Sequence, residues 1–175
     1  MIVNHVLRTE RLLLDPVTAL DLTALAAHWT QPDVRKFLFD GAILSAEEII
    51  TVIAESRRDF AAGGYGFWVI RELADDDGAL AGTVGLRQLD ELGPEIVYSL
   101  TPGVWGKGYA TEAAGAVVDY ALGALGLPEV LAEVDNGNAA SAAVITRLGL
   151  VPFEVVPGLL GPMTRYRKTR PQRGT

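Results

Sequence analysis

The sequence contains no cysteine. This absence excludes a disulfide framework, a thiolate zinc site and a cysteine nucleophile. No apolar run approaches the roughly 20 residues of a bilayer-spanning helix, so no membrane segment is expected. The first residues, MIVNHVLRTERLLL, show neither a basic leader nor a small-residue cleavage site, which predicts a cytoplasmic location.

Basic residues are also in short supply. Fifteen Lys and Arg stand against 22 Asp and Glu, which gives a formal net charge of −7. A general nucleic-acid binder needs the opposite balance, because lysine and arginine displace counterions from phosphate. We therefore expect no nucleic-acid partner. The acidic field suits a cationic substrate, although acidity also serves solubility alone.

The size of the chain matches one ordinary domain. It has 175 residues, of which 49% are hydrophobic, enough to bury a substantial core. No internal repeat, low-complexity segment or linker divides it. We assign residues 1–169 to a single domain and expect residues 170–175 to form a disordered tail.

Cap and turn residues predict the first elements. An opening strand should stop at Pro16, where a backbone donor is lost. Thr18 with Asp21 resembles a capping pair at the start of a first helix. Ser45 with Glu48 forms a second capping box, followed by apolar residues at helical spacing.

The pattern becomes extended and then helical in the middle of the chain. Segments 67–71, 80–87 and 95–100, separated by turn residues, predict an antiparallel meander. Residues 110–125 place apolar side chains at i, i+3, i+4 and i+7 through two cycles, which predicts a helix.

The last third alternates strand and helix. Residues 130–134 should form a strand parallel to 95–100, since a helix connects the two. Asn138 should cap the next helix, which ends at the left-handed position Gly149. Residues 153–156 and 163–168 predict a closing hairpin.

The turn WGKGYA, residues 105–110, joins the strand 95–100 to the following helix. Such a junction presents free backbone N–H groups and the positive end of the helix dipole at one point, which suits a diphosphate. Gly106 and Gly108 let the backbone approach an anion without a side-chain clash. Lys107 can add charge and Thr111 a hydroxyl.

Two other nucleotide motifs fail at this turn. A Walker loop needs Ser or Thr directly after the lysine, whereas Lys107 is followed by Gly108. A Rossmann fingerprint needs Gly or Ala at position 111, which is Thr111, and the chain before Glu95 lacks repeated strand-helix units.

Seven segments in order resemble the GNAT superfamily of N-acetyltransferases, and within it the RimJ/RimL-type branch: TERLLL, PDVRKFL, GFWVI, AGTVGL, EIVYSL, WGKGYATEA and VDNGNAASAAVITRLGLVPF. The resemblance covers nearly the whole chain. It implies an α/β (α+β) GNAT fold, a single domain with a central mixed, mostly antiparallel twisted sheet flanked by helices. It implies an enzyme that transfers the acetyl group of acetyl-coenzyme A to a primary amine by direct attack in a ternary complex.

The resemblance also implies the cofactor site. The family's signature has Gln or Arg, two residues, Gly, one residue, then Gly or Ala; here Trp105 takes the first position, so backbone donors must do most of the binding. The strand end would pair with the pantetheine amides, and the start of the next helix would contact the same arm. The full expected set is Leu100, Thr101, Trp105, Gly106, Lys107, Gly108, Tyr109, Ala110, Thr111, Asn138 and Ser141, with no metal.

The resemblance suggests how the acceptor amine is activated. An alkyl amine is mostly ammonium near neutral pH, so a base must take its proton. Glu95 sits where the family often places a glutamate, and an N–H near Leu100 or Thr101 would stabilise the oxyanion. Many relatives protonate the thiolate with a tyrosine on the last helix, but residues 142–144 are Ala, Ala and Val. Ser141 is the candidate acid in its place.

The branch implies either the α-amine of a protein N-terminus or a small amine such as a polyamine, amino acid or aminoglycoside-like compound. The sequence leaves both open. His5 and His28 lack a partner pattern and should pack or lie at the surface. Substrate choice should depend on the first two helices and the closing hairpin. Aromatic residues that could form apolar walls of the substrate site there, although most should belong to the core, are Trp29, Phe37, Phe39, Tyr65 and Phe67.

Two other classes of function remain open. The missing tyrosine is compatible with a catalytically degenerate acyl-CoA-binding sensor or interaction module. A purely structural interaction domain would bind no cofactor. A homodimer is also possible for any of these.

Overall fold

The computed structural model describes residues 4–36, 38–172 and 174. One eight-stranded sheet, in the order β1-β2-β3-β4-β5-β6-β8-β7, organises the molecule. Its elements along the chain are β1 (Leu7–Arg8), β2 (Leu12–Pro16), η1 (Ala19–Asp21), α1 (Leu22–Trp29), α2 (Pro32–Arg35), η2 (Phe39–Gly41), α3 (Ala46–Gly63), β3 (Phe67–Glu72), β4 (Leu80–Leu89), β5 (Gly93–Leu100), η3 (Pro102–Val104), α4 (Tyr109–Leu122), β6 (Glu129–Asp135), α5 (Ala139–Arg147), β7 (Val151–Val156) and β8 (Met163–Thr169).

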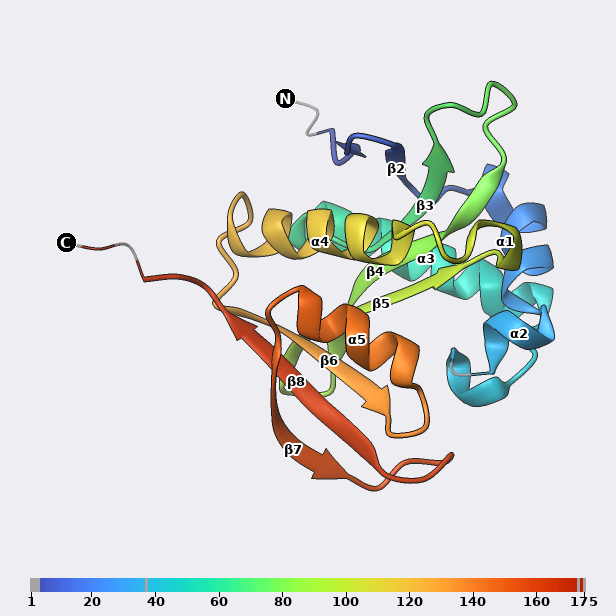
Figure 1. The fold of residues 1–175 in the computed structure, drawn as a ribbon. Helices are drawn as coiled ribbons and strands as arrows, with labels where there is room; N and C mark the ends of the chain where they lie inside the picture. Colours follow the sequence, from blue (N-terminus) through green and yellow to red (C-terminus); the bar gives the residue numbers. More distant parts are fainter. Residues whose placement is uncertain (1–3, 37, 173, 175) are drawn as a thin grey trace.

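Helices cover both faces of this sheet. The helices α4 and α5 lie on one face, while α1, α2 and α3 lie toward the other (Figure 1). All strand neighbours are antiparallel except β5 and β6, which run parallel. The expected single-domain GNAT fold, with a mixed and mostly antiparallel sheet, is confirmed.

The two predicted capping boxes are both formed. The Thr18 hydroxyl accepts from the backbone at the start of η1, and Asp21 reaches back to the Thr18 N–H. Ser45 and Glu48 do the same for α3, which Gly64 closes with φ +81°. Each box satisfies amides that a helix start leaves unpaired.

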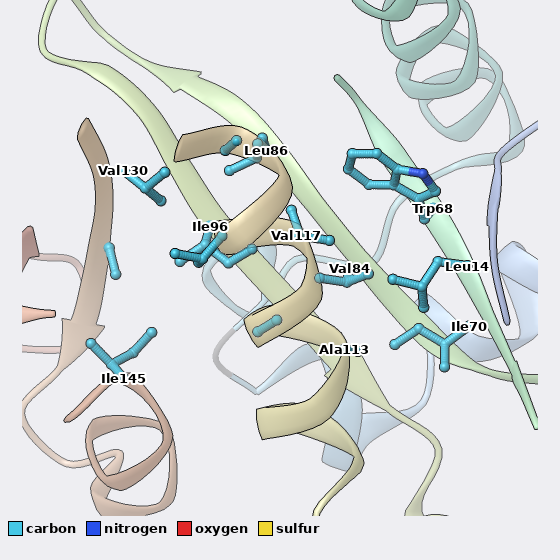
Figure 2. Packing of buried hydrophobic residues seen from close by; sticks show 14 of the residues in the cluster. Leu14, Trp68, Ile70, Val84, Leu86, Ile96, Ala113, Val117, Val130 and Ile145 are labelled. Carbon is cyan, nitrogen blue, oxygen red and sulfur yellow. The ribbon is translucent and has the colours of Figure 1, made fainter. Parts of the chain in front are cut away.

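Helix α4 packs its small side chains on the sheet. Ala113 and Val117 face Val84 and Ile96 across the interface (Figure 2). The helix ends at Leu122 rather than continuing to residue 125, because Gly123 interrupts the helical backbone and takes the C-cap position. The prediction of its end was therefore three residues too long.

Three short elements did not emerge from the sequence pattern. The helix α2 and the turn η2 lie between α1 and α3, and η3 follows β5. Each has four residues or fewer, too short for apolar periodicity to be visible. Residues 33–36 and 38–40 contribute to one wall of a cavity.

The sheet opens between β5 and β6. Their parallel pairing is limited to Glu95 opposite Leu131, close to the start of each strand. Beyond this pair the two strands diverge (Figure 1). Paired strands lie roughly 4.8 Å apart, so the divergence leaves room for a ligand in the plane of the sheet.

No helix in the described part of the chain is long and apolar enough to cross a membrane.

Candidate functional site

A cavity of about 1600 Å³ occupies the opening between β5 and β6. Residues 95–100 of β5 and 132–135 of β6 form its sides. The turn before α4 and the first turns of α5 close one end, while segment 33–40 and the β7–β8 connection close the other. The sheet geometry therefore places residues from six separate segments around one space.

The end of β5 turns backbone groups into this cavity. The Thr101 N–H donates to the Ala81 carbonyl over 2.8 Å, so Thr101 is committed to the sheet. Because backbone groups alternate along an antiparallel strand, those of Tyr98 and Leu100 point away from β4. The Trp105 indole confirms that direction, since its Nε1 donates to the Leu100 carbonyl over 3.0 Å.

The turn before α4 carries a run of unpaired amides. Gly106 and Gly108 have φ of +81° and +82°, which favour glycine, and nothing lies within 4 Å of a Cβ added to Gly106. Among the described residues, none accepts a hydrogen bond from the N–H groups of residues 106–111. Unpaired amides at the positive end of a helix dipole are a common arrangement for binding an anion.

A network of hydrogen bonds around Glu112 and Arg11 holds the turn in place. Glu112 accepts from the Thr9 hydroxyl over 2.6 Å and from Arg11 Nε over 2.8 Å, and Arg11 also donates to the Lys107 carbonyl. Burial alone would raise the pKa of Glu112, but the hydrogen bonds from Thr9 and Arg11 lower it. The turn is therefore fixed from outside the cavity, which leaves its amides free.

Two expected side chains point elsewhere. Lys107 Nζ lies 3.8 Å from Glu72, and the residue does not line the cavity. The Tyr109 hydroxyl also donates to Glu72, and its ring is buried. The expected charge from Lys107 is thus directed away from the cavity, and both residues can contribute there only through the backbone. Trp105, in contrast, lines the cavity and is 52% exposed.

The start of α5 presents a hydroxyl pair. Asn138 caps the helix by accepting from the Ser141 N–H over 3.2 Å. The Ser141 Oγ lies 2.7 Å from the Tyr98 hydroxyl, and both residues line the cavity. Burial raises the pKa of Tyr98 to about 12, so this phenol is neutral near pH 7. Sequence reasoning missed Tyr98, since no local signal brings β5 to α5.

Glu95 occupies the point where the strands separate. It lines the cavity, is 3% exposed and accepts from Arg87 Nε over 2.7 Å. Burial raises the pKa of Glu95, while the charge of Arg87 opposes the rise. A buried carboxylate with a raised pKa is a candidate for proton transfer.

The opposite end of the cavity has fewer aromatic walls than expected. Phe39 lines it, whereas Trp29, Tyr65 and Phe67 pack in the core; Phe37 falls outside the described residues. The predicted contribution of the closing hairpin is present in residues 157–159 and Met163. The carboxylates Asp33, Asp40, Glu133 and Asp135 complete this end.

His28 supports the floor of the cavity. Its Nε2 lies 2.8 Å from the Ser99 hydroxyl, which also contacts the Thr83 hydroxyl, and Ser99 lines the cavity. The His28 side chain is buried, as a packing role requires, and burial lowers its pKa to about 4. In the described part of the chain, no cluster of metal-ligating side chains is present.

Comparisons with known proteins agree with this geometry. The family model described as "Acetyltransferase (GNAT) domain" matches residues 11–151. The uncharacterized N-acetyltransferase YoaA of Bacillus subtilis is 30% identical over 146 residues, covering 82% of this chain and 81% of YoaA. The crystal structure of an acetyltransferase from Agrobacterium tumefaciens superposes with a TM-score of 0.79 at 28% identity, covering 93% of each chain.

A fourth comparison concerns the fold alone. The ribosomal-protein-S5-alanine acetyltransferase of Vibrio fischeri superposes with a TM-score of 0.78 at 16% identity, covering 94% of this chain and 96% of its own. The match of the family model, which spans most of the sequence, carries the assignment. The chain belongs to the GNAT family of acetyltransferases, whose acetyl donor is acetyl-coenzyme A and whose acceptor is an amine.

Proposed function

We propose that this enzyme binds the diphosphate of acetyl-coenzyme A on the backbone of residues 106–111 and acetylates a primary amine that enters from the opposite end of the cavity. The run of unpaired amides at the start of α4 carries the proposal. The N–H groups of residues 106–111 have no acceptor among the described residues, so those that face the cavity could donate to a diphosphate. Trp105, Gly106, Gly108, Ala110 and Thr111 would line this part of the site, with Lys107 and Tyr109 contributing backbone only.

The pantetheine arm would follow the exposed edge of β5. The backbone groups of Tyr98 and the N–H of Leu100 are available to pair with amides, as in an added strand. The Leu100 carbonyl already accepts from Trp105, and the Thr101 amide is bonded to Ala81. Tyr98 therefore replaces Thr101 in our assignment. Asn138 and Ser141 lie across the gap and would contact the same arm.

Glu95 is our candidate base. Acetyl-coenzyme A supplies an acetyl group activated as a thioester, to which the nitrogen lone pair of the amine adds while the thiolate departs. Glu95 would accept the proton of the acceptor ammonium through water, because it lies five residues before Leu100, roughly 16 Å along β5. Its contact with Arg87 holds the carboxylate in one orientation. The Leu100 N–H, which points into the gap, would stabilise the charge that develops on the carbonyl oxygen.

Ser141 and Tyr98 are our candidates for proton delivery to the leaving sulfur. Their hydroxyls lie 2.7 Å apart at the wall of the cavity. Ser141 is the hydroxyl on α5, and Tyr98 keeps it hydrogen-bonded and supplies a second O–H behind it. The hydroxyl pair thus takes the place of the tyrosine that many relatives carry on the last helix.

Two classes of acceptor amine fit the proposed chemistry. The sequence motifs resemble the RimJ/RimL-type branch, which makes the α-amine of a protein N-terminus one candidate acceptor; the Vibrio fischeri enzyme, which is similar in fold, is named as a ribosomal-protein-S5-alanine acetyltransferase. A small primary amine fits the same chemistry. The acidic residues at the acceptor end favour a cationic molecule in either case.

The test compares Gly106→Asp with Gly106→Asn, because a side chain at Gly106 enters open space, whereas one at Gly108 would contact Arg11. Both side chains have nearly the same size and both tolerate the left-handed backbone, so they differ mainly in charge. The aspartate should weaken acetyl-coenzyme A binding roughly tenfold or more relative to the asparagine, because its carboxylate faces the diphosphate. Isothermal titration measures the affinity, and thermal denaturation confirms that both variants fold.

Equal affinities of the two folded variants would show that the diphosphate binds elsewhere. Turnover separates the enzyme from a degenerate sensor. The wild-type protein should release free coenzyme A when a panel of amines and peptides is added, whereas a sensor would bind without turnover.

A further inference from the structure

The two sides of the gap between β5 and β6 have different chemistry. Ile96 of β5 and Val134 of β6 lie in the core under α4 and α5. Since side chains alternate along a strand, the odd-numbered residues Glu95, Glu133 and Asp135 face the opposite side. That side is closed by α2, η2 and the β7–β8 connection, and it is the side on which we place the acceptor.

Asp135 has no partner on this side. It is 8% exposed, and within residues 4–36 and 38–172 no group donates a hydrogen bond to its carboxylate or forms an ion pair with it. Burial raises the pKa of Asp135, and the negative charges of Asp40 and Glu133 raise it further. The carboxylate opens onto the cavity, where the described residues supply no donor, so a cation bound there would compensate its charge.

Other carboxylates nearby are already compensated. Arg165 Nε lies 2.8 Å from Glu133, and Arg87 Nε lies 2.7 Å from Glu95. Among the described residues of this end, Asp33, Asp40 and Asp135 have no ion pair, and the charge of Asp40 acts directly on Asp135. We therefore consider Asp135 and Asp40 together. These two come from opposite walls, β6 and η2, and both line the cavity.

We infer that Asp135 and Asp40 form a cation subsite, so that the acceptor carries a second ammonium group besides the amine that is acetylated. This inference rests on the proposed function and names the substrate class of the same site. A diamine would place its reacting nitrogen at the thioester, beside the Leu100 N–H, and its other nitrogen between Asp135 and Asp40. Charge-assisted hydrogen bonds from that second ammonium would satisfy the unpaired carboxylate.

Either a free diamine or a peptide with a basic side chain could carry the second ammonium group. Pairs of acceptors that differ only in this group distinguish the two possibilities. The first pair is 1,4-diaminobutane with butylamine, and the second is the peptide Ala-Lys-Ala with Ala-Gln-Ala. Wild-type kcat/KM should favour the doubly charged member of at least one pair by roughly tenfold to a hundredfold. A preference for the diamine identifies a free polyamine-like acceptor, and one confined to the peptides identifies a basic residue behind an α-amine.

Asp135→Asn and Asp40→Asn test the two carboxylates. Each should reduce the preference to about threefold or less and lower kcat/KM for the doubly charged member much more than for the singly charged one, because only the second ammonium loses its hydrogen-bond partner. Asp119→Asn removes one exposed carboxylate of α4, outside the cavity, and should retain the full preference. The diamine should also raise the melting temperature of the wild type more than that of Asp135→Asn, a readout independent of turnover.

Equal kcat/KM for both members of both pairs in the wild type would overturn the subsite. An Asp135→Asn variant that loses activity equally on singly and doubly charged acceptors, with a changed pH profile, would also overturn it, because Asp135 would then handle the reacting proton. Failure of the proposed function looks different: no amine would be acetylated and no acetyl-coenzyme A would bind.

Discussion

At the scale of single residues, Glu95 and Tyr98 have separable roles. Glu95→Gln keeps the shape but cannot accept a proton, so kcat/KM should fall roughly 10²- to 10⁴-fold. In the pH-rate profile of this variant, the decrease in rate at low pH that results from protonation of Glu95 should disappear; this decrease is the acidic limb of the profile. Tyr98→Phe removes one hydroxyl of the pair with Ser141 and should lower kcat less, with that acidic limb retained.

Steady-state rates from pH 5 to 9 on one amine provide the comparison. An acidic limb that is identical in wild type and Glu95→Gln would remove Glu95 from proton transfer. An unchanged kcat in Tyr98→Phe would limit that hydroxyl to packing.

His28 makes the stability of the protein depend on pH. Burial lowers its pKa from 6.5 in the unfolded chain to about 4 in the folded one, so the unfolded state binds more protons between these values. The contribution of His28 is therefore complete above pH 6.5 and is lost as the pH falls toward 4. Between pH 7.5 and 5 the loss is on the order of 2 kcal/mol by this linkage.

His28→Gln should lack this part of the pH dependence. Urea unfolding at pH 7.5 and pH 5 gives the two free energies of unfolding, and the decrease between them should be smaller in the variant. His5→Gln, at the other histidine, serves as the control and should behave like the wild type. A variant as pH-sensitive as the wild type would mean that His28 is not the titrating group.

At the scale of elements, the edge of β5 should show an alternating pattern of amide exchange. The Thr101 N–H is bonded to Ala81 and the Ser99 N–H points to the same side, so both should exchange slowly. The amides of Tyr98 and Leu100 face the gap and should exchange faster. Added coenzyme A should slow these two and leave the other two nearly unchanged.

Residue-resolved hydrogen exchange by NMR, with and without coenzyme A, measures the four amides together. Uniform protection along residues 98–101 in the free protein would show that the gap is closed in solution. Equal slowing of all four amides by coenzyme A would indicate general stabilisation rather than pairing along one edge.

Local signals explain which elements could be predicted from the sequence. The boxes Thr18/Asp21 and Ser45/Glu48, and the glycines of the turn 105–110, act within a few residues, so their chemistry is visible in the sequence. The end of α4 was placed too late, because its apolar pattern continues past Gly123. Short elements such as α2 depend on tertiary contacts and left no signal.

At the scale of the whole molecule, the site residues divide in the same way. The amides before α4 and the cap at Asn138 were predictable, since each belongs to one local motif. The hydrogen bond between Tyr98 and Ser141 joins residues 43 apart in the sequence. Asp40 and Asp135, which are further apart in the sequence, line the same cavity. Such pairs depend on how the strands are ordered, which single-sequence patterns do not determine. The expected homodimer stays a prediction, and light scattering of the purified protein would test it.

The opening in the sheet assigns its two sides to different stretches of the chain. The donor side comes from the end of β5, the turn before α4 and the start of α5, whereas the acceptor side draws on residues 33–40 and the β7–β8 connection. Exchange of the latter two segments between relatives could therefore alter which amine is chosen without disturbing the grip on coenzyme A. Because the two sides come from different segments, proteins with this fold can change their acceptor and keep the same donor.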